Sequence, residues 1–286
     1  MAPRTAPAAP PGTVPTLQDP GPGLVVLDPP RAALLLELDS LFTDLAAELD
    51  APGVVGPPLL PAEGLARLDY FRNFPHLGVA AARFPDQAVE ALAAGRPVAE
   101  QPVSPTGYLL PSATCYGLLL SLAGQDVGPE LRLTAVGRCF RNEDHYDGLR
   151  RLWGFHMREV VYFGTAEGAR EHLARSKEFI ETLASRLGVE LSYQPANDPF
   201  FDKSGSRAKL MALDPVKYEF VATDGTAIAS VNRHRNFFGE RLGITSEGAV
   251  AHSSCTAFGV ERWVHAMVLA HGTAQDALRQ VRDVRG

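Results

Sequence analysis

The residues best suited to chemistry lie in one segment, 138–159, in which two arms rich in aromatic and charged residues flank a short polar loop. The first arm carries Arg141 and Glu143, and the return arm carries Phe155 and Glu159. The loop predicts an antiparallel hairpin, and residues two apart in a strand point to the same face. An arginine, a carboxylate and an aromatic ring on one face could hold a phosphate, a base edge and a base plane. The segment therefore indicates a nucleotide site in outline, although an ordinary surface ion pair is the alternative for Arg141 and Glu143 alone.

Neither of the two common glycine-rich phosphate loops occurs in the sequence, which has no GxxxxGKS/T and no GxGxxG after a predicted strand. Arg141 and Arg262, which lies in a predicted helix near the C-terminus, would have to hold the phosphates instead. A guanidinium suits this role because its planar fork binds two oxygens at once. We therefore expect a nucleotide to be held mainly by arginine side chains.

The three cysteines, Cys115, Cys139 and Cys255, are odd in number and widely spaced, which argues against a disulfide framework and indicates a reducing cytoplasm. Cys139 is expected to be a small buried residue in a strand. Cys115 and Cys255 each follow a short polar run where a strand is expected to end. Together with one carboxylate they could give zinc three ligands and an open fourth position. No CxxC pair supports this, so buried apolar cysteines are the alternative.

Helices and strands are mixed along the chain, and no strand–helix–strand series recurs, which indicates an α+β fold with an antiparallel sheet flanked by helices. An amphipathic helix is predicted at 30–49, and a second begins at the N-cap Thr165 and ends before Gly188. Ser112 follows a short predicted strand, and a polar loop in that place commonly contacts substrate. Further strands are predicted at 131–140, 189–193, 218–222 and 226–231, and the last of them leads to Asn232.

The length and composition of the chain limit the classes of protein to which it can belong. The chain has 286 residues and a formal charge of −6, which argues mildly against a long nucleic acid as its partner. No apolar run reaches the length needed to span a membrane. Residues 1–23 are rich in proline and alanine, so we expect a disordered tail there and a single catalytic domain at 24–286.

Two motifs together resemble those of class II aminoacyl-tRNA synthetases. Segment 138–159 is similar to motif 2, with the FRxE core at Phe140–Glu143. The end of motif 3, GxGxxR, is similar to the run that closes at Arg262, although Ala257 stands at the first glycine. The turn at 197–201 and the strand before Asn232 are similar to those of seryl-tRNA synthetases, and the resemblance covers about residues 30–270.

Two departures from the seryl-tRNA synthetase pattern indicate which sub-family the sequence resembles. The chain has no room for the long coiled-coil arm with which seryl-tRNA synthetases grip tRNA. Ser112–Cys115 replaces the usual TAE loop and, with Glu159 and Cys255, is similar to the Cys/Glu/Cys zinc site of the methanogen-type enzymes. The amino acid:[carrier protein] ligases are short bacterial homologues that have this core and zinc triad without the tRNA arm, and the sequence resembles them.

This resemblance implies a role for each site residue. The metal ligands would be Cys115, Glu159 and Cys255. The substrate contacts would be Ser112 and Asn232. The remaining residues would bind ATP: Arg141 at the α-phosphate, Glu143 at the adenine amino group, Phe155 on the adenine ring, and Arg262 at the γ-phosphate, with Arg151 as a second candidate there.

The implied reaction is the ATP-dependent activation of glycine or alanine and transfer to the phosphopantetheine thiol of a carrier protein. Zn²⁺ and ATP with Mg²⁺ would be needed. The family glutamate for Mg²⁺ is Ala227 here, so Glu219 or Asn232 would contribute instead. The helix at 30–49 resembles motif 1 and implies a homodimer. The alternatives are a fragment that charges tRNA and a catalytically silent paralogue.

Overall fold

The computed structural model describes residues 17–196 and 216–286. The motif-like turn at 197–201 and most of the expected tail at 1–23 lie outside the described residues. None of the helices in the described parts of the chain combines the length and the apolar composition needed to cross a membrane.

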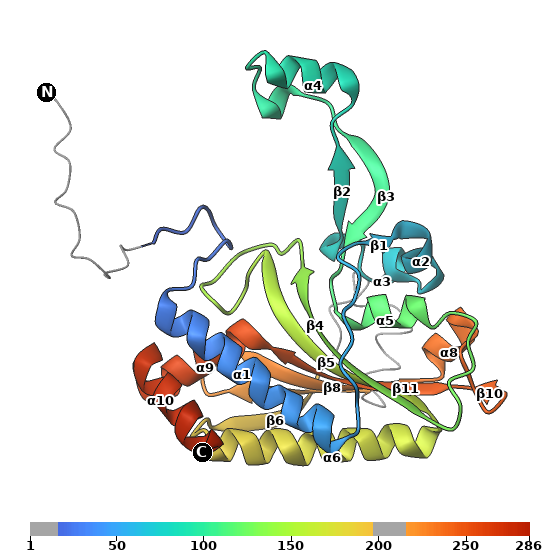
Figure 1. Ribbon diagram of the computed structural model, residues 1–286, viewed down its shortest axis with the longest axis vertical. Coiled ribbons are helices and arrows are strands. Elements are labelled where there is room, and N and C mark those ends of the chain that lie inside the picture. The colour runs from blue at the N-terminus through green and yellow to red at the C-terminus, as the bar shows by residue number, and fades with distance from the viewer. Residues whose placement is uncertain (1–16, 197–215) are drawn as a thin grey trace, which may run out of the picture.

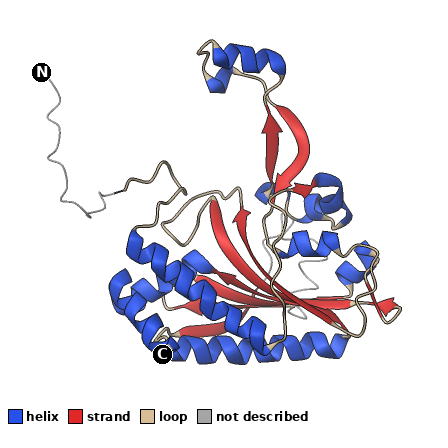
Figure 2. Ribbon diagram, viewed as in Figure 1, coloured by secondary structure: helices blue, strands red, loops and turns tan. Residues whose placement is uncertain are grey.

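The helices and strands follow one another along the chain as a mixed α+β series (Figures 1 and 2). The described helices are α1 Pro29–Glu48, α2 Ala62–Arg67, α3 Tyr70–Asn73, α4 Asp86–Ala93, α5 Cys115–Ser121, α6 Ala166–Arg186, α8 Phe237–Leu242, α9 Val260–His271 and α10 Ala274–Arg285, with 3₁₀ turns η1 Pro75–Leu77 and η2 Val98–Glu100. The described strands are β1 Leu60–Pro61, β2 Val79–Arg83, β3 Ser104–Leu110, β4 Leu131–Phe140, β5 Gly154–Gly164, β6 Leu191–Ala196, β7 Lys217–Ala222, β8 Ala227–Arg235, β9 Thr245–Ser246, β10 Ala249–Val250 and β11 His252–Gly259.

The central element is a six-stranded sheet with the order β4-β5-β11-β8-β7-β6, and every neighbouring pair is antiparallel. This confirms the predicted α+β class. Several predicted strand boundaries were wrong. β6 begins two residues later than expected, and β8 runs on to Arg235 because its second half pairs with β11, whose Ser253 lies opposite Arg235.

Helices α1, α6, α9 and α10 cover one face of this sheet (Figures 1 and 2). The first helix begins at the N-cap Asp28, whose side chain accepts from the amide of Arg31, and has prolines in its first turn. Phe42 of α1 is fully buried and stacks on Phe258 of β11, with ring centroids 4.3 Å apart. Full burial of such a side chain contributes about 1.5–3 kcal/mol, so this contact is a main anchor of α1 on the sheet.

A buried ion pair also ties α1 to the sheet. Arg158 of β5 is 7% exposed and binds Asp39 of α1 through two bonds, Nε to Oδ1 at 2.5 Å and Nη2 to Oδ2 at 2.8 Å. Its third contact is Nη1 to Thr134 Oγ1 at 3.1 Å. A two-point bond of this kind fixes both distance and orientation.

A projecting arm, residues 79–110, stands away from the body (Figure 1). Strands β2 and β3 pair antiparallel, α4 lies at the far end, and β1 joins the near end in a sheet of order β1-β3-β2. The sequence predicted only the last part of β3. After Leu110 the chain re-enters the body, and Cys115 begins α5 there.

Candidate active site

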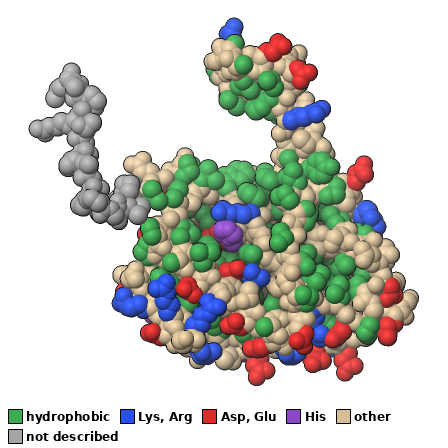
Figure 3. Space-filling view, viewed as in Figure 1, with side chains coloured by type: hydrophobic (Ala, Val, Ile, Leu, Met, Phe, Trp, Pro, Cys, Tyr) green, Lys and Arg blue, Asp and Glu red, His purple; other side chains and the backbone are tan. Residues whose placement is uncertain are grey.

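Two adjoining pockets lie on the opposite face of the sheet from α1, and together they are lined by all ten residues that the sequence singled out. The larger, about 400 Å³, is lined among others by Ser112, Cys115, Glu159, Asn232 and Cys255. The smaller, about 90 Å³, is lined among others by Glu143, Arg151, Phe155 and Arg262. Arg141 lines both pockets and so marks their junction. Figure 3 shows the side of the molecule that carries α1, where basic and histidine side chains lie close together near the centre, below the projecting arm.

The register of the strands explains why the sheet leaves space for the two pockets. Glu159 of β5 lies opposite Ala257 of β11, Ala257 opposite Ser230 of β8, and Ser230 opposite Glu219 of β7. Directly opposed residues on one face of a sheet are close neighbours. The two small side chains at 230 and 257 therefore leave room between the flanking carboxylates, and both of them line the two pockets.

Arg141 and Glu143 do not lie on a strand, contrary to the prediction. Strand β4 ends at Phe140, because beyond it only the amide of Arg141 still pairs, with Trp153 O at 3.1 Å. The Arg141 guanidinium is held by Nε donation to Ser112 O at 3.1 Å and lies 5.1 Å from the centroid of the Phe155 ring. The loop still turns both residues into the smaller pocket.

Arg262 enters the smaller pocket from the first turn of α9. Its Nε donates to Arg150 O at 2.8 Å, and its Nη1 donates to Ala227 O at 2.9 Å. Burial, with a smaller effect from the charge of Arg141, lowers the pKa of Arg262 to about 10. The guanidinium therefore stays protonated at neutral pH and retains its charge for an anion.

Arg151 lies against acidic neighbours in the same loop. Its Nη1 is 2.9 Å from Glu143 Oε2 and 3.4 Å from Asp144 Oδ1. The two residues expected at the adenine and at the γ-phosphate are thus ion-paired with each other. A ligand that engages Glu143 would compete with Arg151 for the carboxylate.

Cys115, Glu159 and Cys255 meet at the base of the larger pocket, each at most 6% exposed. Cys255 lies in the middle of β11 rather than at a strand end, because the buried Ser253 and Ser254 before it continue the strand. The amide of Cys115 donates to Glu159, and the three side chains lie close enough to interact with one another.

The protonation of these three groups is coupled. Burial, followed by the nearby Cys255 sulfur, raises the pKa of Glu159 well above its usual range. The hydrogen bond between the thiols raises the pKa of Cys115 and lowers that of Cys255. Three acidic groups in mutual contact cannot all ionise unless a cation lies among them.

Two thiolates and a carboxylate are a donor set that suits Zn²⁺ in type. However, across residues 17–196 and 216–286 no group of three or more His, Cys, Asp and Glu side chains is arranged so that it could hold a metal ion. The donors contact each other instead. Cys139, by contrast, is a fully buried thiol whose pKa burial raises to about 12, and its predicted place as a small residue inside a strand is confirmed.

Two residues that line these pockets were not predicted from the sequence. His234 of β8 lines the larger pocket, interacts with the Cys255 sulfur, and has its Nδ1 3.0 Å from Ser253 Oγ. Lys217 of β7 lines both pockets and lies 3.0 Å from Glu219. Both share a strand face with predicted site residues at a spacing of two, which is the signal that could have found them.

Comparison with known proteins agrees with the fold. Residues 108–271, more than half of the chain, match the tRNA synthetase class II core domain (G, H, P, S and T). The chain also superposes on M. kandleri SerRS in complex with A. aeolicus tRNASec, with a TM-score of 0.79, 22% identity, and coverage of 93% of this chain and 58% of that one. Seryl-tRNA synthetase from Pyrococcus horikoshii complexed with ATP gives a TM-score of 0.65 at 15% identity, over 88% of this chain and 54% of that one. The chain thus spans a little over half the length of these solved structures.

Curated relatives are more similar in sequence. Amino acid–[acyl-carrier-protein] ligase 1 of Bradyrhizobium diazoefficiens is 32% identical over 248 residues, which cover 80% of this chain and 75% of the relative. Ligase 2 of the same organism is 32% identical over 76% of this chain and 69% of the relative. The type-2 serine–tRNA ligase of Methanocaldococcus jannaschii is 24% identical over 88% of this chain and 54% of the relative.

The antiparallel sheet and the matched core residues define the class as that of the class II aminoacyl-tRNA synthetase core, whose members use ATP together with Mg²⁺. Within this class, the chain belongs to the family of the amino acid–[acyl-carrier-protein] ligases.

Proposed function

We propose that the protein activates a small amino acid, glycine or alanine, as an aminoacyl-adenylate and transfers it to the phosphopantetheine thiol of a carrier protein. The observation that carries this proposal is the pair of joined pockets, in which Arg141 stands between an arginine-lined pocket and a buried Cys/Glu/Cys floor. The membership in a ligase family supports the same reaction.

In the first step ATP would occupy the smaller pocket, with Phe155 against the adenine ring, Glu143 at its amino group, and Arg262 at the γ-phosphate. A carboxylate oxygen of the amino acid, bound in the larger pocket, attacks the α-phosphorus. The bond to the bridging oxygen breaks, and pyrophosphate leaves with its electron pair. Arg141, at the junction of the pockets, stabilises the charge that develops on the α-phosphate. Catalysis of this kind is positioning plus electrostatics, with no protein nucleophile.

In the second step the carrier thiol, after losing its proton, attacks the acyl carbon of the adenylate. The carbon–oxygen bond to the phosphate breaks, and AMP leaves as the product. Ser112 and Asn232 line the larger pocket and would contact the amino acid there. Ser112 O also holds Arg141, so one loop would orient both the amino acid and the phosphate-binding group.

We also propose that Cys115, Glu159 and Cys255 hold Zn²⁺, a proposal supported by the donor types and their burial. The three side chains, which contact each other here, would have to move apart around the ion. The ion would supply a Lewis-acid position for the substrate amino group. For Mg²⁺, Glu219 is better placed than Asn232, because Glu219 lines the smaller pocket whereas Asn232 lines the larger one and donates to Cys255 Sγ at 3.4 Å. A cytoplasmic location and a homodimer remain predictions from the sequence.

The deciding experiment incubates the protein with Mg²⁺–ATP, labelled glycine or alanine, and one of three acceptors: phosphopantetheinylated carrier protein, the same carrier without its phosphopantetheine, or bulk tRNA. We expect label on the phosphopantetheinylated carrier alone. Label on tRNA and none on any carrier would establish the tRNA-charging alternative. Failure to exchange pyrophosphate into ATP with every amino acid would indicate a silent paralogue.

A further inference from the structure

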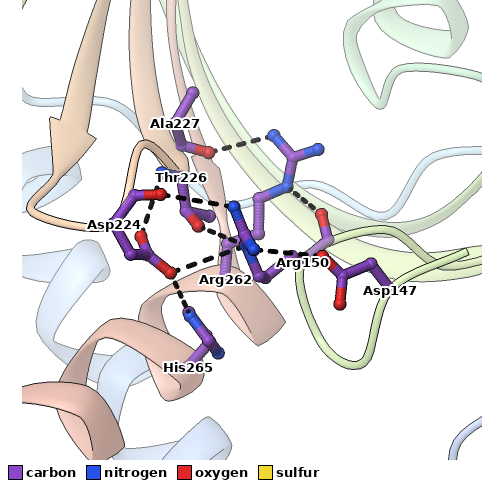
Figure 4. Close-up of polar contacts among 7 residues, drawn as sticks. All are labelled: Asp147, Arg150, Asp224, Thr226, Ala227, Arg262 and His265. Atoms are coloured by element: carbon purple, nitrogen blue, oxygen red, sulfur yellow. Dashed lines mark hydrogen bonds and ion pairs between the residues drawn. The ribbon is translucent and has the colours of Figure 1, made fainter.

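Arg150 joins two segments that are far apart in the sequence, the 141–153 loop and the 223–226 turn between β7 and β8 (Figure 4). Its Nε donates to Thr226 Oγ1 at 2.8 Å, and its Nη2 donates to Asp224 O at 3.3 Å. Its Nη1 donates to Asp147 Oδ2 at 3.0 Å within the loop. One planar fork therefore connects both segments at once, which a lysine could not reproduce.

The turn is itself held in place. His265 Nε2 of α9 lies 2.7 Å from Asp224 Oδ2, and the amide of Thr226 donates to Asp224 Oδ1 at 3.0 Å. Burial alone would raise the pKa of Asp224, but the bonds from His265 and Thr226 outweigh it and lower the pKa to about 2. Asp224 is thus an ionised partner for Arg150, whose Nε lies 3.5 Å from its Oδ2.

The same two segments supply the acceptors of Arg262. Its Nε bonds Arg150 O in the loop, and its Nη1 bonds Ala227 O directly after the turn (Figure 4). Both acceptors are neutral carbonyls. Within the described residues no carboxylate lies at ion-pair distance from Arg262, whereas Arg150 is paired with Asp147 and Asp224. The charge of Arg150 is therefore neutralised by carboxylates of the protein, whereas the charge of Arg262 is available to bind an anionic ligand.

We propose that Arg150 is a positioning residue for the ATP site: it clamps the 141–153 loop to the 223–226 turn and so fixes the two carbonyls that aim Arg262 into the smaller pocket. This inference rests on the proposed function, in which Arg262 binds the γ-phosphate. AMP lacks the γ-phosphate and should therefore depend on the clamp much less than ATP does, only through Arg141 and Glu143 of the loop. The comparison of ATP with AMP therefore separates aiming of Arg262 from a general loss of structure.

The test measures the affinities of the full chain for Mg²⁺–ATP and for AMP by titration calorimetry. For Arg150→Met we expect about a tenfold loss for ATP, the effect of misplacing one charge-assisted contact, and less than about a twofold loss for AMP. Arg170→Met, an exposed arginine on α6, is the matched control and should change neither affinity. The double variant Arg150→Met/Arg262→Met should bind ATP no more weakly than Arg262→Met alone, because both act through one contact. Equal losses for ATP and AMP, or additive losses in the double variant, would overturn the proposal.

A second measurement tests the clamp by Arg150 without any nucleotide, so it does not depend on the proposed function. Amide hydrogen exchange of the ligand-free protein should be faster in the 141–153 loop of Arg150→Met than in wild type or Arg170→Met. Wild-type protein that binds neither nucleotide would refute the proposed function. Unchanged exchange in Arg150→Met would refute the clamp whatever the nucleotide result.

Discussion

His172 lies on α6 against the ring of Tyr162, with ring centroids 6.1 Å apart, and only 1% of its surface is exposed. Burial, reinforced by the positive charge of Arg132, lowers the pKa of His172 from 6.5 to about 3. His234 and Arg175 add smaller repulsions of the same sign. The native protein therefore keeps this imidazole neutral over a pH range in which the unfolded chain protonates it.

The sign and size of the effect follow from linkage. Below pH 6.5 the unfolded state binds one more proton at His172 than the native state, so acid favours unfolding until the native pKa near 3 is reached. The stability is fully present above the unfolded pKa and declines as the pH falls. At pH 5 the unfolded state gains a factor of about thirty, or about 2 kcal/mol in the free energy of unfolding.

Urea unfolding at pH 8 and at pH 5 measures this loss directly. We expect the difference in the free energy of unfolding between the two pH values to be about 2 kcal/mol smaller in His172→Phe than in wild type, because phenylalanine keeps the ring contact with Tyr162 and has no proton to gain. His172→Asn is a second variant in case the phenyl ring does not fit. If both variants lose as much stability as wild type between pH 8 and pH 5, the reasoning about His172 is wrong.

Three further predictions concern the ion pair and the two proposed metal ions. Asp39→Ala should lower the free energy of unfolding by about 3–5 kcal/mol, because it leaves the Arg158 charge buried and unpaired; a loss under about 1 kcal/mol in chemical denaturation would mean that solvent reaches the pair. Chelation of zinc, or Cys115→Ala, should abolish amino-acid-dependent exchange of pyrophosphate into ATP, with metal content measured on the same samples; exchange indifferent to both would reject the zinc proposal. Glu219→Gln should raise the Mg²⁺ concentration needed for ATP binding by about tenfold, as expected when one of the few carboxylates serving Mg²⁺ is lost; an unchanged requirement would exclude Glu219 as a ligand.

All ten residues that the sequence singled out line the two joined pockets, and their roles there stay predictions. The local backbone was predicted less well. The strand assignment of Arg141 and Glu143 failed, because alternation of residue types cannot tell a strand from the loop that continues it. Cys255 was placed at a strand end because serines often mark one, yet Ser253 and Ser254 are buried in mid-sheet.

Other features depend on pairings that no local pattern encodes. A spacing of two relates Lys217 to Glu219 and His234 to Asn232 in the sequence, but only the register of β7 and β8 shows that Lys217 lies opposite Asn232. Arg150 directly precedes Arg151, the second candidate for the γ-phosphate, and nothing in the local sequence marks it as a positioning residue. Its partners are 74–76 positions away, so only the folded chain brings them together.

Arg158 and Glu159 are consecutive residues of β5, and they face opposite sides of the sheet. Arg158 binds Asp39 of α1 on the helix-covered side of the sheet. Glu159 lies in the floor of the larger pocket beside the thiols of Cys115 and Cys255. A single peptide unit thus links the outer helix α1 to the base of the larger pocket. The helix α1 and the pocket floor thus share one short backbone connection, so the position of α1 on the sheet and the position of Glu159 depend on the same strand residues.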